Sequence, residues 1–526
     1  MVQMNLSSLL SLYSWFMDTH AHAGQSFSKV RSFLFPIYKN EFKKIIPMGL
    51  MMALIAFNFW LAHNAKDIII ISAPESGAEV IHFLKVGVFV FSIIFVMIYT
   101  WISNFISQRA IFYGIISLFM GFFLLFAFVI YPHQDICHMA PEKIAHLKIL
   151  YPHFKWLIPA IGYWGFALFY IFSEMWSVLV ITLLFWQFAN QITTVEQSKR
   201  CYMVFSMFNG LGAIVAGFFL LFYAHAKETD CFDPHAYGDT IQEMFLFFVV
   251  SCALIMALYY WINKYTVREK EQYHTQDESP TPKKNKIQLS FLESFKYILK
   301  SRYVGYIAIM TIAFNVGINF VEVTWKSQIK ILHQTHHGIQ GYLGNVTLYM
   351  GIITFLMALI GLNFVRRVSW RRSALVTPIL MGITGFAFFA LTLFDEAFSP
   401  LISFLGVTPL MMSVWMGQAN NLLSKSCKFS FFDVTREMAY IPLDAELKVK
   451  GKAAVDIMGG RVGKLAGSLV QGFFLSLIPC ATQLSIAPYI ALLLAVVLVF
   501  WVVAIRGLHK EFLYVAYGKK PDEKSL

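Results

Sequence analysis

The sequence has little charge for its length. Asp, Glu, Lys and Arg make up 14% of its 526 residues, whereas a soluble globular chain carries about 25%. Apolar residues take their place: they reach 58%, with 52 phenylalanines among them. One or two soluble domains cannot bury that much apolar surface, so the composition excludes a cytosolic enzyme. It predicts an all-helical, polytopic membrane protein.

The sequence also lacks the motifs of catalysis and of metal binding. It contains no GxxxxGK[ST] phosphate loop, no nucleophile elbow and no HExxH, so we expect neither an enzyme nor a bound cofactor. The six cysteines show no CxxC and no paired spacing, which argues against a zinc site or a disulfide framework. A bond between Cys137 and Cys231, both in predicted outer loops, stays open. The histidines His333, His336 and His337 lack acidic partners, so we expect a solvated loop there rather than a metal site.

Long apolar runs divide the chain into two similar halves. A helix needs about 20 apolar residues to cross the hydrocarbon core, and twelve such runs occur, six on each side of a charged linker over 265–302. We expect six-helix halves over 46–264 and 303–506, with tails over 1–45 and 507–526. Six helices, a linker and six helices are the layout of major-facilitator-type transporters. The predicted spans are 46–66, 84–104, 109–131, 156–190, 203–224, 242–264, 303–326, 343–364, 373–395, 398–424, 453–477 and 485–506.

The loops between these spans carry charge in alternation. Lys and Arg collect in every second loop, including the linker and residues 425–452. The positive-inside rule places those loops, the linker and both termini in the cytoplasm. This placement also accounts for the net charge of +12, so no nucleic-acid partner is expected. The tetrapeptide Ile-Ala-Phe-Asn occurs at Ile55–Asn58 and again at Ile312–Asn315, equivalent points of the two halves, which supports an internal repeat.

Several ionisable side chains fall inside the predicted spans. Each costs at least about 2.5–3.5 kcal/mol there, so each is expected to pair or to line a water-filled path. Glu174 lies near the middle of its span. Glu322 and Lys326 have the i, i+4 spacing of a helical ion pair. Lys66, Asp67 and Lys326 lie near the outer ends of predicted spans, so snorkelling to the lipid headgroups is the alternative interpretation of those three.

The predicted eleventh span carries two cations, Arg461 and Lys464, three residues apart. Glycines within 459–467 allow close helix packing and also leave room for a ligand beside the cations. Inward-facing cations outnumber acids in this half, which favours an anionic substrate. Four tryptophans near the charges are candidates to stack a planar base or to mark the membrane interface: Trp60, Trp176, Trp186 and Trp325.

Five segments resemble one family of transporters. Phe431–Asp456 (FFDVTREMAYIPLDAELKVKGKAAVD) closely resembles the signature of the nucleotide transporters of obligate intracellular bacteria and plastids, the ADP,ATP carrier family. Ala73–Glu79, Ser173–Trp176, Phe185–Thr193 and Val321–Lys326 resemble further motifs of that family, in the same order. The resemblance implies import of ATP across the bacterial inner membrane in exchange for ADP and phosphate, by alternating access.

The resemblance also implies which charges matter, namely Lys66, Glu174, Glu322 and Lys452. A polyphosphate needs several cations in surroundings of low dielectric constant, where the attraction between opposite charges is stronger than in water. The expected substrate-binding residues are Lys66, Glu174, Glu322, Lys326, Lys452, Arg461 and Lys464.

One departure from the family pattern bears on coupling. The family often has Arg three residues before the Lys of the first span, whereas this sequence has His63. His titrates near neutral pH, so His63 and Asp67 are candidates for moving a proton. Proton-coupled symport of nucleoside triphosphates is therefore an alternative to ATP/ADP exchange. A membrane receptor that senses nucleotide without transporting it is a more distant one.

Overall fold

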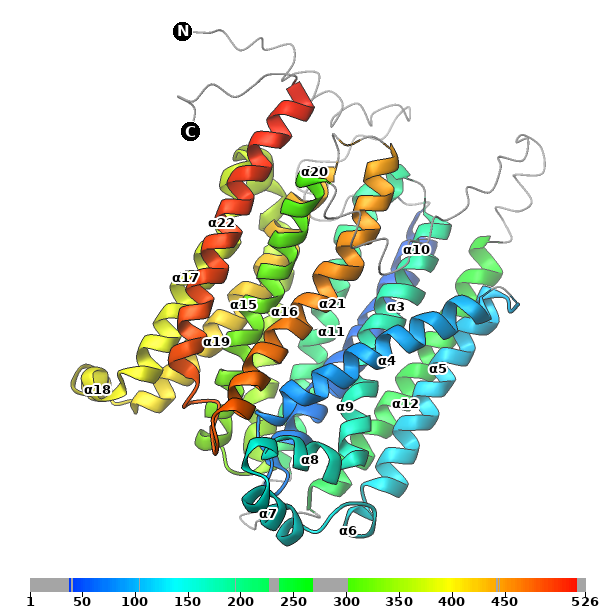
Figure 1. The fold of residues 1–526 in the computed structure, drawn as a ribbon. Coiled ribbons are helices and arrows are strands. Elements are labelled where there is room, and N and C mark those ends of the chain that lie inside the picture. The colour runs from blue at the N-terminus through cyan, green and yellow to red at the C-terminus, as the bar shows by residue number, and fades with distance from the viewer. Residues whose placement is uncertain are drawn as a thin grey trace, which may run out of the picture.

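The computed structural model describes residues 37–38, 41–103, 105–193, 195–226, 236–267, 301–440, 443 and 445–517. All regular secondary structure in these ranges is helical, which confirms the predicted all-helical fold. The axes of most of the long helices are nearly parallel, and these helices form one bundle (Figure 1). Cys231 lies outside the described residues.

The first set of helices precedes the predicted linker. Ser107 begins one of them as an N-cap, accepting a hydrogen bond from the Ala110 amide, as serine commonly does at helix starts. Short π-helical segments extend this helix over Phe126–Ile130 and two others over Ser177–Phe185 and Asn263–Val267. The first set comprises α3 (Phe42–Ser72), α4 (Val80–Ile102), α5 (Gln108–Leu125), α6 (Gln134–Cys137), α7 (Pro141–Leu150), α8 (Leu157–Gly162), α9 (Trp164–Trp176), α10 (Trp186–Ile192), α11 (Val195–Ala226) and α12 (Ala236–Ile262).

The second set follows residue 300. Ser301 caps its first helix through the Val304 amide. The set comprises α15 (Arg302–Leu332), α16 (His336–Arg367), α17 (Trp370–Leu393), α18 (Asp395–Phe404), α19 (Pro409–Cys427), α20 (Asp433–Tyr440), α21 (Ala445–Leu477) and α22 (Ala487–Tyr517).

The number of membrane crossings is lower in the described residues than the sequence predicts. Ten helices are long and apolar enough to cross a membrane, or eleven if the bent pair α18 and α19 forms one span. The 33-residue α21 is not among them, because Arg461, Lys464 and Gln471 lower its apolar character. The structure thus supports a multi-pass membrane protein, and the count of twelve stays a prediction.

Two predicted span boundaries are wrong. The span predicted over 398–424 is two helices that meet at 94°. The break has a local cause: Gly406 has a φ of 72°, a conformation that glycine adopts readily. Thr408 then caps a new helix through the Met411 amide, with Pro409 at its first position, where proline is favoured. The span predicted over 156–190 likewise begins later, at Trp164, after the separate helix α8.

The ends of α3 and α15 correct a third interpretation. α3 continues to Ser72 and α15 to Leu332, so Lys66, Asp67 and Lys326 lie inside these helices rather than at their ends. Their side chains are 1%, 2% and 4% exposed. Snorkelling to the headgroups is therefore wrong for all three.

Helix packing repeats between the two sets. In the first, α3 packs against α9, α11 and α12; in the second, α15 packs against α19, α21 and α22. The predicted close packing of the glycine stripe is confirmed, because Gly459, Gly463 and Gly467 lie against Thr311, Asn315 and Asn319 of α15. The two sets meet where α11 contacts α16 and where α4 contacts α21. This arrangement places α3 and α15 near the middle of the bundle (Figure 1).

Candidate functional site

Charged side chains from four helices converge between the two sets. On the first set, Lys66 Nζ lies 2.9 Å from Asp67 Oδ1 and 3.1 Å from Glu174 Oε1 of α9. On the second set, Glu322 Oε1 lies 3.2 Å from Lys326 Nζ and 3.1 Å from Lys425 Nζ of α19. We call these six residues, together with His63, the charge cluster.

Asp67 joins the two sets of helices. Its Oδ2 lies 2.8 Å from Lys326 Nζ, so a carboxylate of α3 binds an ammonium of α15. Lys66 is further held over the ring of Tyr170, with its Nζ 4.1 Å from the ring centre. Buried charges persist only where partners neutralise them, and here the partners come from α3, α9, α15 and α19.

His63 lies between two carboxylates of the cluster. Its Nε2 is 3.8 Å from Asp67 Oδ2, and its Nδ1 is 3.7 Å from Glu174 Oε1. Both distances exceed those of direct hydrogen bonds. The His63, Glu174 and Glu322 side chains keep 16%, 14% and 13% of their surface accessible, unlike Lys66 and Asp67. Lys425 keeps 25%, so these four groups are the part of the cluster that a small solute can reach.

Two further lysines belong to the same region. Lys85, on α4, interacts electrostatically with Glu322, Lys326 and Glu174. Lys464, on α21, acts on Glu174 and on Lys85. Lys464 is exposed and Lys85 is partly buried.

Sequence reasoning missed Lys85 and Lys425. Lys85 stands at the second residue of the predicted span 84–104 and resembles an end anchor, and Lys425 falls just outside the predicted span 398–424. The sequence does contain a signal for Lys425, because Thr408-Pro409 is typical of the start of a helix. A helix beginning there contains Lys425.

Two predicted binding residues are placed neither in the cluster nor beside it. Arg461 lies on α21, half-buried and about one turn from Lys464, with no ion pair in the described part of the chain. Lys452 lies near the start of α21, and its side chain is outside the described residues. Their predicted roles therefore rest on the sequence alone.

Two of the four candidate base-stacking tryptophans are buried, and the other two are partly exposed. Trp176 donates its indole N–H to the Ile55 carbonyl and is fully buried, and Trp325 donates to the Val414 carbonyl and is 2% exposed. Neither ring has a free face for a base. Trp186 packs on Tyr202, and Trp60 lies 5.8 Å from the His63 ring. Of the four, Trp60 is the one whose ring contacts a side chain of the charge cluster among the described residues.

A polar layer closes the bundle beyond the cluster, at the end where α3 gives way to α4. Gln483 lies in the loop after α21. Its Nε2 donates hydrogen bonds to Thr324 Oγ1 at 3.0 Å and to Gln471 Oε1 at 2.5 Å, and its Oε1 lies 2.9 Å from His82 Nε2. Its backbone N–H donates to Glu79 Oε1 at 3.0 Å. We call this group the closing layer; it ties α4 of the first set to α15 and α21 of the second.

Three more bonds between the sets lie at the same end. Trp156 Nε1 donates to the Ala481 carbonyl at 2.7 Å, and Lys330 donates to the Ser76 carbonyl. His153 Nδ1 lies 2.8 Å from the Ser476 carbonyl oxygen. These bonds tie the loop after α3 to α15, and the segment before α8 to the end of α21 and the loop after it.

A surface ion pair lies at that end within the first set alone. Lys148 Nζ is 2.8 Å from Glu75 Oε2, and Glu75 is 43% exposed. The hydrogen bond from Lys148 lowers the pKa of the Glu75 carboxyl below its usual range. Because both residues belong to the first set, this pair does not hold the two sets together.

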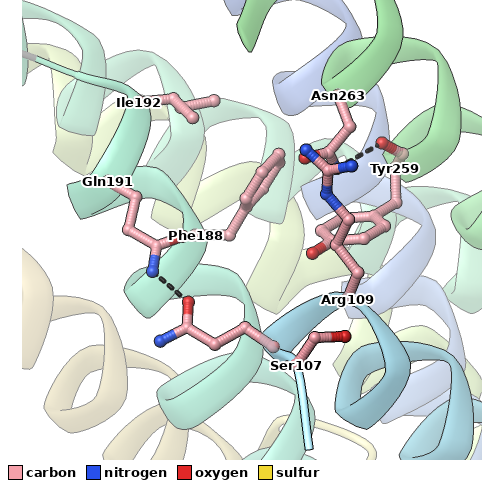
Figure 2. Close-up of a pocket in the computed structure, with 8 residues that line it drawn as sticks. Ser107, Arg109, Phe188, Gln191, Ile192, Tyr259 and Asn263 are labelled. Carbon is pink, nitrogen blue, oxygen red and sulfur yellow. Dashed lines mark hydrogen bonds between the residues drawn. The ribbon is translucent and has the colours of Figure 1, made fainter.

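A separate pocket of about 470 Å³ lies at the opposite end of the bundle, where α5 begins and α10 and α12 end (Figure 2). Arg109 is its single charged residue, and Gln191 donates a hydrogen bond to Gln108 across it. One cation does not match a polyphosphate, so the charge cluster is the better candidate site. The pocket is lined by Ser107, Gln108, Arg109, Phe188, Gln191, Ile192, Tyr259 and Asn263.

Comparison with known proteins identifies the family. The model of the TLC ATP/ADP transporter family matches residues 20–512. The chain belongs to this family. It is therefore a membrane transporter rather than an enzyme.

Relatives in intracellular bacteria cover nearly the whole chain. ADP,ATP carrier protein 1 of Chlamydia muridarum (strain MoPn / Nigg) is 38% identical, over 95% of this chain and 94% of its own length. ADP,ATP carrier protein 1 of Rickettsia bellii (strain RML369-C) is 39% identical, over 92% and 96%. ADP,ATP carrier protein 3 of Rickettsia prowazekii (strain Madrid E) is 38% identical, over 93% and 98%.

Solved structures share the fold at low sequence identity. A mutant of the nucleoside transporter NupG aligns over 89% of this chain and 100% of its own, with a TM-score of 0.54 and 11% identity. A bacterial homologue of the iron transporter ferroportin aligns over 90% and 100%, with a TM-score of 0.54 and 13% identity. These similarities support a major-facilitator-like fold.

Proposed function

We propose that this protein exchanges ATP for ADP across the bacterial inner membrane, with phosphate as a possible accompanying substrate. The observation that carries the proposal is the excess of cations in the charge cluster and beside it. Five lysines surround three carboxylates there: Lys66, Lys85, Lys326, Lys425 and Lys464 surround Asp67, Glu174 and Glu322. An anion with three to four charges suits such an excess, because the low-dielectric interior strengthens each contact.

Binding and conformational change are coupled through Asp67 and Lys326. Lys326 is held by Asp67 and Glu322. A polyphosphate competes with these carboxylates for the ammonium, which releases Asp67 and weakens one bond between the two sets of helices. The halves 46–264 and 303–506 then rock against each other, and the closing layer opens. Glu174 and Glu322 hold the lysines again once the nucleotide has left.

The orientation follows from the charges of the loops. The positive-inside rule assigns the linker 265–302 and both termini to the cytoplasm. On this assignment the closing layer faces the periplasm and closes the bundle on that side. Lys452 and Arg461, nearer the cytoplasmic end of α21, are assigned to guiding the phosphates on that side.

Counter-exchange in proteoliposomes tests the proposal. Purified protein is reconstituted into vesicles loaded with ADP, ATP, GTP or no nucleotide, and uptake of labelled ATP is followed. Exchange predicts rapid uptake into vesicles that contain ADP or ATP and little uptake into empty ones. Binding without any counterflow would identify a nucleotide receptor instead, and the proposed exchange would be wrong.

Proton-coupled symport of nucleoside triphosphates is the second candidate. It is favoured by one observation, the position of His63 between Asp67 and Glu174. A histidine between two carboxylates can take up a proton and share it with either of them. In that case uptake into empty vesicles requires an inward proton gradient and is abolished by a protonophore.

A further inference from the structure

Two lysines near the charge cluster are left out of its ion pairs. The three carboxylates of the cluster are each matched by lysine, since Asp67 and Glu174 bind Lys66, Asp67 also binds Lys326, and Glu322 binds Lys326 and Lys425. In the part of the chain that the structure describes, neither Lys85 nor Lys464 forms an ion pair or a hydrogen bond. They are therefore the surplus cations of the site.

These two lysines belong to neighbouring helices of the two different sets. Lys85 stands on α4 and Lys464 on α21, two helices that pack together, and their charges act on one another. Both also act on Glu174. Two unpaired ammonium groups in a membrane interior repel each other, and the repulsion is relieved when an anion lies between them.

Lys85 does not simply extend to the headgroups. Its charge acts on Glu322 and Glu174 in the middle of the bundle. One turn earlier on the same helix, His82 is 1% exposed and bound to Gln483 at 2.9 Å. The closing layer therefore lies between Lys85 and the nearer end of the bundle.

Lys464 is available to a solute. It is exposed, although the adjacent Gly463 is packed against Asn315 of α15. An ammonium has three donors and no acceptor, so an accessible, unpaired one suits a phosphate oxygen. Lys66, in contrast, is 1% exposed and bound to two carboxylates.

We propose that Lys85 and Lys464 form a phosphate clamp, one lysine from each set of helices, that binds the polyphosphate of the nucleotide before Lys66 and Lys326 exchange their acidic partners. The clamp rests on the proposed function, because its ligand is the phosphate chain of a nucleoside di- or triphosphate. It explains why the substrate joins the two halves as it binds. No carboxylate has to be displaced for this first contact.

Binding to the full-length protein in nanodiscs tests the clamp. Affinities for AMP, ADP, ATP and inorganic tripolyphosphate are measured by calorimetry. Lys85→Gln and Lys464→Gln should each weaken ATP and tripolyphosphate binding about tenfold or more, with a smaller loss for AMP. Lys85→Arg should largely preserve binding. Lys148→Gln, a lysine outside the cluster, should leave every affinity unchanged.

The outcomes separate the clamp from the function on which it rests. If the wild-type protein binds no adenine nucleotide, the proposed function fails. If it binds ATP, and Lys85→Gln and Lys464→Gln bind ATP equally well, the clamp alone is wrong. An equal loss for AMP, ADP and ATP would also overturn it, because a lysine that only supports the fold does not distinguish phosphate number.

Discussion

Asp67 is the residue on which the charge cluster depends. It is 2% exposed and binds Lys66 of its own helix and Lys326 of the second set at 2.9 and 2.8 Å. No other carboxylate of the charge cluster binds a lysine from the opposite set. Loss of its charge therefore affects both the stability of the fold and the contact between the sets.

We expect Asp67→Asn to destabilise the protein markedly. Asparagine keeps the volume but leaves the three lysines of the cluster, two of them buried, with two carboxylates, and breaking a buried ion pair costs about 3–5 kcal/mol. The apparent melting temperature in detergent should fall well below that of the wild type. Glu75→Gln removes the exposed partner of Lys148 and, at about 0–1 kcal/mol, serves as the matched control. Equal melting temperatures for the two variants would contradict the role of Asp67.

His63 decides between the two modes of transport. If it carries the coupling proton, triphosphate uptake into vesicles without ADP should rise with an inward proton gradient. His63→Arg, which fixes a positive charge at that position, should then abolish the dependence on the gradient and leave nucleotide binding largely intact. His146→Arg, on the exposed face of α7, is the control. Uptake that needs internal ADP and ignores the gradient would instead establish strict exchange.

The helices that carry the site extend beyond their predicted limits. A scan for apolar runs ends a span where charges begin, so it placed Lys66 at the end of one span and Lys425 beyond the end of another. The helices continue through these positions because lysines and carboxylates from different helices neutralise each other. This neutralisation depends on tertiary contacts between helices, so it cannot be predicted from a short stretch of sequence.

Other features of the site could be predicted locally. The i, i+4 spacing of Glu322 and Lys326 predicted an ion pair, and the structure confirms it at 3.2 Å. Glu174, in the middle of an apolar run, was predicted to pair or to line a wet path, and it binds Lys66. Trp176 and Trp325 were wrong as candidates for base stacking, because composition does not reveal which rings face the core.

The closing layer should control access from the periplasm. Gln483 holds His82, Thr324 and Gln471, so Gln483→Leu should weaken the closed state and raise the outward-facing population. A single cysteine at Thr324, a fully buried position, should then react faster with a thiol reagent added outside. Gln418→Leu, which loses only the bond to Tyr342 within the second set, should not change the rate. Unchanged labelling with Gln483→Leu would remove the closing layer from the mechanism.

The molecule as a whole follows a repeated plan. α3 and α15 occupy equivalent central positions. Each packs against the last two long helices of its own set, α11 and α12 for α3 and α21 and α22 for α15. The Ile-Ala-Phe-Asn repeat lies on these two helices, where Asn58 bonds to Ser251 of α12 and Asn315 bonds to the Gly459 carbonyl of α21. The family and the fold were thus predictable from motifs and hydropathy, whereas the charge cluster required the packing of four helices.

The proposed orientation has a direct test in the linker. Single cysteines between Ser279 and Asn285, in a background without other cysteines, should react with a membrane-impermeant reagent only after the cells are opened. The reason is the basic charge of this segment, which the positive-inside rule retains in the cytoplasm. Labelling from outside intact cells would reverse the orientation and change the span count.

The central claim is that the charge cluster and its surplus lysines bind the nucleotide. The position of ATP in a cryo-EM structure of the full-length protein tests it most directly. We predict that the phosphates lie between the two sets of helices, within hydrogen-bond distance of Lys85 and Lys464 and close to Lys66 and Lys326. ATP bound with its phosphates in the pocket around Arg109, or in contact with one set of helices alone, would contradict the account.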